Sequence, residues 1–151
     1  MKLAEALMER KDRKARMEAL KKRLYQNAKT EEGTVPAEVP SSLLADLGQE
    51  IDAFAALVGR INRTNATAGL DDGTSLADAL IQRDMLRYRH LVLGNLADHA
   101  LPSTSRYSAR ELRSVATVDI AQVRREADDV ARACRLLDSR IQRRNWEIDL
   151  V

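Results

Sequence analysis

Residues 120–148, with the sequence IAQVRREADDVARACRLLDSRIQRRNWEI, decide the fold of this chain. Their apolar side chains recur at alternating steps of three and four residues, interrupted only by Arg144: Ile120, Val123, Ala127, Val130, Cys134, Leu137, Ile141 and Ile148. This spacing aligns the side chains along one stripe of a helix, as in helices that pack lengthwise against each other. The stretch therefore predicts a long helix, at about residues 120–147, inside a helical assembly.

Three further segments are predicted to be helical, at about residues 2–28, 42–66 and 75–100. The apolar series of the second is Leu44, Leu47, Ile51, Phe54, Val58 and Ile61, and that of the third is Leu76, Ala79, Leu86, Leu93, Ala97 and Ala100. Leu80, Leu91 and Leu96 widen the apolar face of the third segment, so we expect it to contact two neighbours. A capping-box pattern at Ser108 and Glu111 predicts a short helix at 109–114.

These elements predict an all-α fold in a single helical domain, residues 1–151. We expect an elongated antiparallel bundle of four long helices plus a short helix, with coiled-coil-like packing. A small hydroxyl residue often caps the start of a helix, which predicts Ser41 or Ser42 at the second long helix and Thr74 or Ser75 at the third.

The first helix differs from the others because residues 9–16 are almost all charged. A helix without a continuous apolar seam could project from the body or pair with another chain. The loop at 29–40 is longer than most helix hairpins need, so it could cross the bundle or let the first helix exchange between subunits.

Composition argues against a membrane or secreted protein. No apolar run approaches the roughly 20 residues needed to span a bilayer, and the charged start of the chain makes a poor signal peptide. The single cysteine, Cys134, cannot form an internal disulfide, which agrees with a reducing compartment. We expect a cytoplasmic protein that does not contact the membrane.

Charge is distributed unevenly along the chain. Residues 1–28 carry nine Lys or Arg and four Asp or Glu, whereas residues 29–100 carry six and eleven. Five basic side chains of the first helix form a possible interaction face: Lys11, Lys14, Lys21, Lys22 and Arg23. They could bind nucleic acid, but no aromatic residues interleave with them, so we favour a face directed at the acidic middle of this fold or of a neighbouring subunit.

The sequence predicts no catalytic residues, no metal site and no cofactor. A di-metal helical bundle needs Glu-x-x-His pairs, but Arg87 precedes His90 and Leu96 precedes His99 at that spacing. Cys134 lies in an apolar seam, where a free thiol behaves as a small hydrophobic group. We therefore do not expect an enzyme.

Several polar residues are predicted to meet at one end of an up-down-up-down bundle: Asn62, Asn65, Asp78, Asn145 and Trp146. They could form a small binding site, and an enzyme using that site is a third functional possibility. We favour a hydrogen-bonded plug that sets helix register, as a seam asparagine can.

Residues along nearly the whole chain resemble a small bacterial family of unknown function whose members are often labelled septicolysin. The similarity is carried by Met1 to Leu7, Arg23-Leu24, Asn27-Ala28, Glu32-Gly33, Pro36, Glu38, Pro40, Ile61-Asn62, Thr64-Asn65, Arg83-Asp84, Arg106-Tyr107-Ser108, Asp138, Ile141-Gln142 and Asn145-Trp146. The label implies a cytolysin, but the composition, without a secretion signal or a membrane-inserting segment, argues against that activity.

From these observations we expect a self-associating helical protein with a scaffolding or protein-interaction role. The protein is expected to be a homo-oligomer, and the sequence does not identify any other protein partner. A nucleic-acid-associated module that uses the basic first helix is the alternative.

Overall fold

The computed structural model describes residues 1–102 and 114–151. It contains four helices: α1 (Leu3–Gln26), α2 (Pro40–Thr67), α3 (Leu76–His99) and α4 (Ile120–Glu147). Within these described ranges there is no strand, although Lys2 and Asp149 form an isolated antiparallel bridge. The predictions of an all-helical fold and of four long helices are confirmed. The short helix predicted at 109–114 falls outside the described residues except for Ser114, which is not helical.

The chain divides into two compact units, and each is described by itself. The first comprises residues 1–69 and 142–151, and the second comprises residues 70–141. Among the described residues, no helix combines the length and the apolar character that crossing a membrane requires.

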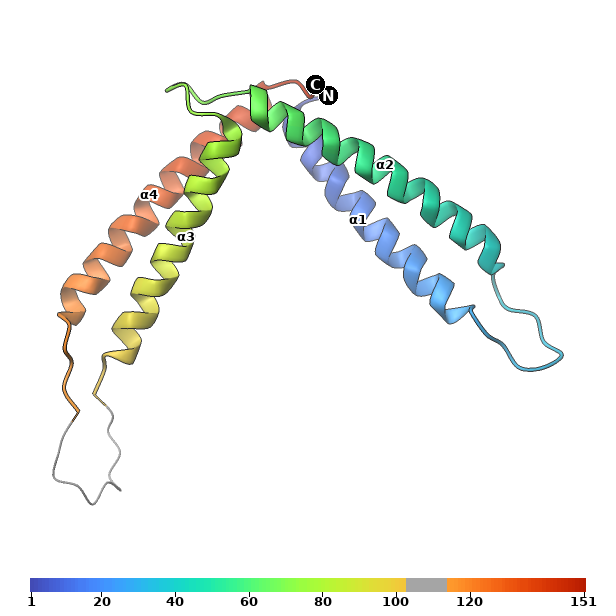
Figure 1. The fold of residues 1–151 in the computed structure, drawn as a ribbon, viewed down its shortest axis with the longest axis horizontal. Coiled ribbons are helices and arrows are strands. Elements are labelled where there is room, and N and C mark those ends of the chain that lie inside the picture. Colours follow the sequence, from blue (N-terminus) through green and yellow to red (C-terminus); the bar gives the residue numbers. More distant parts are fainter. Residues whose placement is uncertain (103–113) are drawn as a thin grey trace, which may run out of the picture. The chain divides into compact units, whose positions relative to one another are not determined.

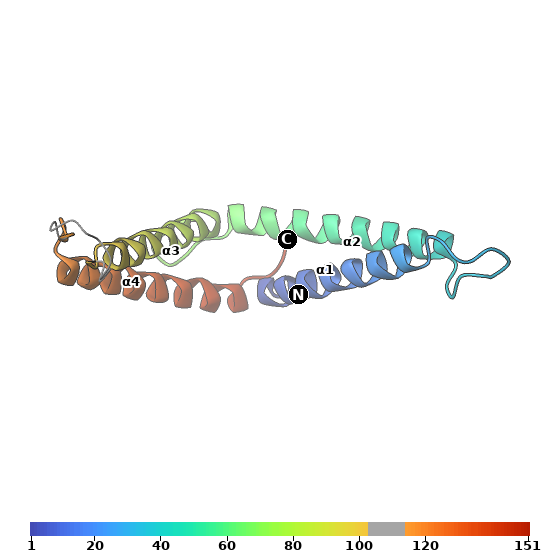
Figure 2. The ribbon, with the colours of Figure 1, turned by 90° about the horizontal axis from the view of Figure 1, so that it is seen from below.

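In the first unit, α1 and α2 lie side by side and run in opposite directions (Figures 1 and 2). Leu3, Ala6 and Ile61 are fully or almost fully buried in this unit. The charged middle of α1 is accommodated because Arg13 forms ion pairs with Glu9 on its own helix and with Glu50 on α2. The first helix therefore pairs with the next helix of its own chain, rather than projecting from the body.

The loop at residues 27–39 connects these two neighbouring helices. Glu38 forms an ion pair with Arg23, and its backbone N–H donates to Asn27 Oδ1 at 3.0 Å. The prediction that Ser41 or Ser42 caps α2 is wrong, because the helix begins at Pro40 with Val39 as its N-cap. Proline suits the first helical position, since its φ is already helical and the N–H that it lacks would have no partner there.

In the second unit, α3 and α4 lie side by side (Figures 1 and 2). His90 Nδ1 lies 3.1 Å from the carbonyl oxygen of Ala127, and Arg83 Nη1 lies 3.4 Å from Asp138 Oδ1. Members of both predicted apolar series are buried in this unit: Leu76, Ala79, Ala97, Ala127, Val130 and Ile141. Ser75 is the N-cap of α3, one of the two residues predicted, and its Oγ accepts from the backbone N–H of Asp78.

Candidate interaction surfaces

One side of α3 carries large apolar residues that the second unit leaves exposed. Ile81, Met85, Tyr88 and Val92 expose 61%, 59%, 63% and 46% of their surface. They follow one another at steps of four, three and four residues, so they lie along one stripe of the helix. We call these four residues the outer face of α3, and Leu91 and Leu96 extend its apolar surface.

The opposite side of α3 faces α4, as the contacts of Arg83 and His90 show. The helix thus has two apolar sides, and in the described part of this unit α4 covers one of them. Sequence reasoning expected a second neighbour from Leu80, Leu91 and Leu96, but it missed the four residues of the outer face. The regular spacing of Ile81, Met85, Tyr88 and Val92 was the signal that could have identified them.

A shallow hollow of about 380 Å³ lies beside the outer face and is lined by Gln82, Met85, Leu86 and Arg89. Residues at positions i, i+3, i+4 and i+7 form a diamond on a helix surface, and these four residues have that spacing. In lengthwise helix packing, four residues of one helix form the hole that accepts a side chain of the facing helix. The hollow therefore has the pattern of such a hole.

The basic residues of α1 separate into two groups. Lys21 forms an ion pair with Glu18, and Arg23 forms one with Glu38. The hydrogen bonds to these carboxylates raise the pKa of Lys21 and of Arg23. Lys22 is exposed next to them.

The second group lies nearer the start of α1, where Arg10, Lys11 and Lys14 line a hollow of about 380 Å³ together with Phe54 and Val58 of α2. Within the described residues, none of these three cations forms an ion pair. The hollow thus combines positive charge with an apolar floor, and it places the single phenylalanine of the chain among the cations. Sequence reasoning missed this juxtaposition because Phe54 lies on another helix.

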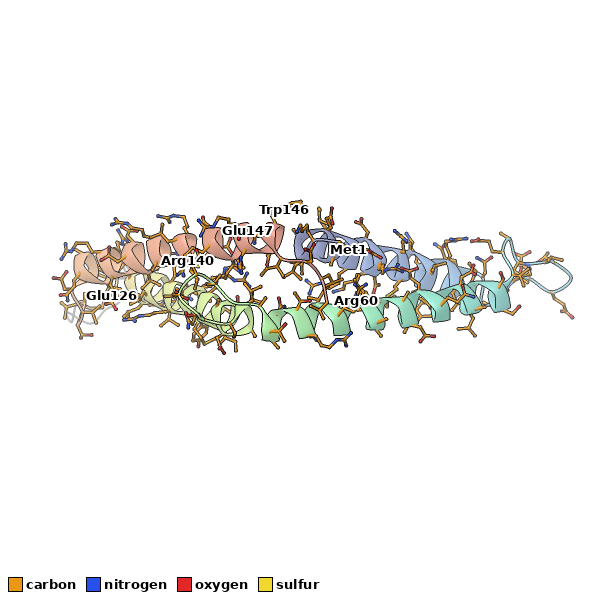
Figure 3. All side chains as sticks on the ribbon, turned by 90° about the horizontal axis from the view of Figure 1, so that it is seen from above. Met1, Arg60, Glu126, Arg140, Trp146 and Glu147 are labelled. Atoms are coloured by element: carbon orange, nitrogen blue, oxygen red, sulfur yellow. The ribbon has the colours of Figure 1, made fainter. Side chains whose placement is uncertain are left out.

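The residues of the predicted polar cluster have different environments. Asn145 is buried and Asn65 is half-buried, whereas Asn62 and Asp78 are exposed. Asp78 belongs to the second unit, where its carboxylate accepts a hydrogen bond from Ser75 Oγ at the start of α3. Trp146 is 55% exposed and points away from α4 (Figure 3). The shared plug or binding site stays a prediction.

Sequence reasoning also missed Thr64, a fully buried residue of α2. Its hydroxyl donates to the carbonyl oxygen of Arg60 and accepts from the backbone N–H of Val151, both at 3.0 Å. In the same unit, the Leu3 N–H donates to the carbonyl oxygen of Ile148, and the Leu150 N–H donates to the carbonyl oxygen of Met1. The residues at the two ends of the chain are therefore joined by backbone hydrogen bonds within the first unit.

Arg144, which interrupts the apolar series of the last helix, also has a structural contact in the first unit. Its Nε donates to the carbonyl oxygen of Gly69 at 2.7 Å, just after the end of α2. A hydrogen bond to a backbone carbonyl compensates for placing a guanidinium where the sequence pattern expects an apolar side chain.

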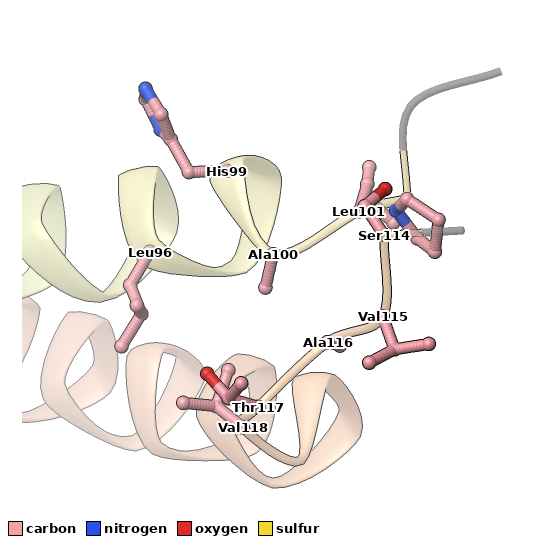
Figure 4. A pocket seen from close by; sticks show the side chains of 10 residues that line it. Leu96, His99, Ala100, Leu101, Ser114, Val115, Ala116, Thr117 and Val118 are labelled. Carbon is pink, nitrogen blue, oxygen red and sulfur yellow. The ribbon is translucent and has the colours of Figure 1, made fainter. Parts of the chain in front are cut away.

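A third hollow, of about 420 Å³, lies in the second unit between the end of α3 and the segment before α4 (Figure 4). Its described lining is mostly small or apolar: Leu96, His99, Ala100, Leu101, Pro102, Ser114, Val115, Ala116, Thr117 and Val118. The His99 ring points away from the other lining side chains, and its Nδ1 lies 2.7 Å from the carbonyl oxygen of Asn95. The described lining brings no base to a nucleophile. In the described ranges, no group of three His, Cys, Asp or Glu could hold a metal ion.

Comparison with known proteins gives two similarities. The model of a family described as "Family of unknown function (DUF6847)" matches residues 10–150. A crystal structure of a functionally unknown conserved protein from Corynebacterium diphtheriae is 41% identical and has a TM-score of 0.92. That similarity covers 100% of this chain and 99% of the other. Nothing among the curated proteins matches the chain.

Proposed function

The chain belongs to the DUF6847 family of unknown function, and we propose that it is a cytoplasmic protein that self-associates through coiled-coil-like helix packing and serves as a scaffold or protein-interaction module. The exposed outer face of α3 carries this proposal. The single free cysteine is consistent with a reducing compartment. We infer no catalytic step, and we do not infer the cytolytic activity that the septicolysin label implies.

The physical argument is that an apolar helix stripe is stable only when another element covers it. Ile81, Met85 and Tyr88 are each more than half exposed, although they lie on one continuous stripe of α3. The outer side of α2 also carries exposed apolar residues, Leu44 and Ile51. Contiguous apolar patches on a protein surface mark interaction sites, whereas single exposed apolar residues need no explanation.

The mass of the purified protein in solution, by size-exclusion chromatography with light scattering, tests this proposal. The wild-type protein is expected at a discrete multiple of 16.9 kDa. Tyr88→Glu should reduce the mass, because it places a charge in the apolar contact. Tyr25→Glu is the matched control, since Tyr25 is a helical tyrosine that is 68% exposed but has Lys21, Lys22 and Glu18 as its neighbours one and two turns earlier. A wild-type mass of one chain, independent of concentration, would refute self-association.

The second candidate function, nucleic-acid binding, is favoured by the hollow that Arg10, Lys11 and Lys14 form with Phe54. Cations that have no acidic partner can neutralise phosphates, and an aromatic ring can stack on a base. Lys21 and Arg23 of the predicted basic face are paired with carboxylates, so we propose that Lys11 and Lys14 of that face make the nucleic-acid contact.

Fluorescence anisotropy with a labelled single-stranded oligonucleotide, measured over a range of salt concentrations, tests this second function. Affinity should fall as salt rises, and Lys11→Glu with Lys14→Glu should abolish binding. Lys29→Glu in the loop is the control and should lower affinity only slightly. Absence of binding at low salt, or equal loss in the control, would rule out this surface as a nucleic-acid site.

A further inference from the structure

The outer face of α3 has the register of a two-helix seam. Its four residues are spaced alternately four and three positions apart: Ile81, Met85, Tyr88 and Val92. This spacing keeps the side chains of two supercoiled helices in contact along their length. They lie on the side of α3 away from Arg83 and His90, whose contacts with α4 place that helix on the other side. A partner helix could therefore lie along α3 without displacing α4.

The residues that flank this seam indicate which helix the partner is. Where two helices pair in parallel, a flanking residue of one meets the residue five positions later on the other. Two copies of α3 would then place Asp84 beside Arg89, and Leu91 beside Leu96. An antiparallel pair would instead place Asp84 near Leu91 and Gln82 near Arg89, which pairs no opposite charges.

The two charged flanking side chains remain accessible despite their contacts within the chain. Asp84 forms ion pairs with Arg83 and Arg87, and its side chain is 56% exposed. Arg89 forms an ion pair with Glu126, and its side chain is 63% exposed. Each can therefore reach a group on a second copy without first leaving a buried site.

We infer that α3 pairs in parallel with α3 of a second copy of this chain, with Ile81, Met85, Tyr88 and Val92 forming the seam and the Asp84 and Arg89 side chains meeting across it. This inference rests on the proposed self-association and specifies its surface. The hollow lined by Gln82, Met85, Leu86 and Arg89 lies at the edge of this seam, where it can accept a side chain of the second copy.

Disulfide cross-linking in a Cys134→Ser background tests the direction of the pair. Ile81→Cys and Val92→Cys are made separately, oxidised mildly and analysed on non-reducing gels. These positions are about 16 Å apart along the helix. In a parallel pair each cysteine lies beside its own equivalent, so both variants should form covalent dimers. In an antiparallel pair at most one of them can do so.

Arg87→Cys is the control, because Arg87 is exposed on α3 but lies off the seam. Cross-linking of Ile81→Cys and Val92→Cys without Arg87→Cys would support the inference. Cross-linking of one seam position, of neither, or of all three equally would overturn it. Light scattering on the same samples distinguishes failure of the α3 pair from failure of self-association. An oligomer without the expected cross-links would mean that the chains associate through another surface, such as that of α2. A monomer would refute both the α3 pair and self-association.

Charge exchange gives a second readout that does not depend on cysteine reactivity. Asp84→Arg should shift the protein towards monomer, because it faces Arg89 of the second copy with a like charge. Combining it with Arg89→Asp restores opposite charges and should return the mass to the wild-type value. Failure of the double variant to recover, in a protein that keeps its helical circular dichroism, would contradict the parallel register.

Discussion

At the scale of single residues, the buried polar contacts are the most informative. Thr64 and Thr67 both donate a hydroxyl hydrogen bond to the carbonyl four residues earlier on α2. Only Thr64 is buried and also accepts from the backbone N–H of Val151. Because this hydrogen bond is partly buried, the Thr64 hydroxyl stabilises the position of Val151 beside α2.

Thr64→Val keeps the shape of the side chain but removes the acceptor. We expect it to lower the free energy of unfolding by about 1 kcal/mol, because the partly buried hydrogen bond from the N–H of Val151 is lost. Thr67→Val, on the exposed side of the same helix, should change it by less than about 0.5 kcal/mol. Urea unfolding followed by circular dichroism measures both, and equal effects would show that the Val151 contact contributes nothing.

The acid stability of the fold depends on carboxylates that are charged and paired. Hydrogen bonds from Arg140 Nη2 at 2.6 Å and from the Thr74 backbone at 3.0 Å hold the pKa of Asp72 well below its usual range. Arg23 lowers the pKa of Glu38, and Lys2 lowers that of Asp149. Because the folded state binds these protons less readily than the unfolded state, this stabilisation is present above about pH 4 and lost as pH falls through the folded pKa values.

Asp72→Asn should therefore lower the urea midpoint at pH 7, and its difference from wild type should shrink as the pH is lowered towards 2. Asp52→Asn is the control, since Asp52 is exposed on α2 and has no ion pair in the described part of the chain. A difference between wild type and Asp72→Asn that persists unchanged at pH 2 would show that the charge of Asp72 is not the cause.

At the scale of elements, α2 and α3 begin with different capping arrangements. Ser75 caps α3 through its side chain, while Val39 and Pro40 begin α2 without a side-chain cap. The sequence contains both features, a proline at the start of α2 and a serine at the start of α3. The sequence analysis predicted a hydroxyl residue as the cap in both cases, Ser41 or Ser42 at α2 and Thr74 or Ser75 at α3, and at α2 the proline decided the boundary.

Ser75→Ala should lower the free energy of unfolding by about 1 kcal/mol, because the N–H of Asp78 loses its acceptor. Ser42→Ala, in the first turn of α2, should have almost no effect, since that helix does not use the hydroxyl as a cap. Thermal unfolding of the two variants beside wild type measures the difference, and a larger loss in Ser42→Ala would contradict the assignment of the caps.

At the scale of the whole molecule, each unit is built on a pair of long helices whose outer sides keep apolar residues exposed. A pair of helices has one interface, so a helix that is apolar on two sides leaves one of them uncovered. If copies of the chain cover these sides, folding and association are linked, and stability depends on protein concentration.

The melting temperature of the wild-type protein should therefore rise as its concentration is increased over two orders of magnitude. In Tyr88→Glu the melting temperature should be lower and nearly independent of concentration, whereas Tyr25→Glu should behave like wild type. Differential scanning fluorimetry at several concentrations measures this. A wild-type melting temperature that does not change with concentration would count against association under these conditions.

The sequence by itself determined the features that depend on residues a few positions apart. The stripe at 120–141 predicted a helix, and the structure buries Val130 and Ile141 of that stripe. Thr74 or Ser75 was predicted to cap the third helix, and Ser75 is the cap in the structure. The helix ends at 147, where the sequence placed it, but the neighbouring residues Asn145 and Trp146 differ: one is buried and the other exposed. Successive residues of a helix point about 100° apart, so their adjacency in the sequence does not show whether both side chains face the same neighbours.

Only the tertiary structure decided which distant residues meet. The pairing of α1 with α2 brought Phe54 to Lys11 and Lys14 and gave Arg13 its partner Glu50. The tertiary structure also leaves the outer face of α3 uncovered within the second unit, and it joins Thr64 to Val151 in the first unit. These contacts depend on which stripes face each other, and periodicity specifies that a stripe is apolar but not which helix will cover it.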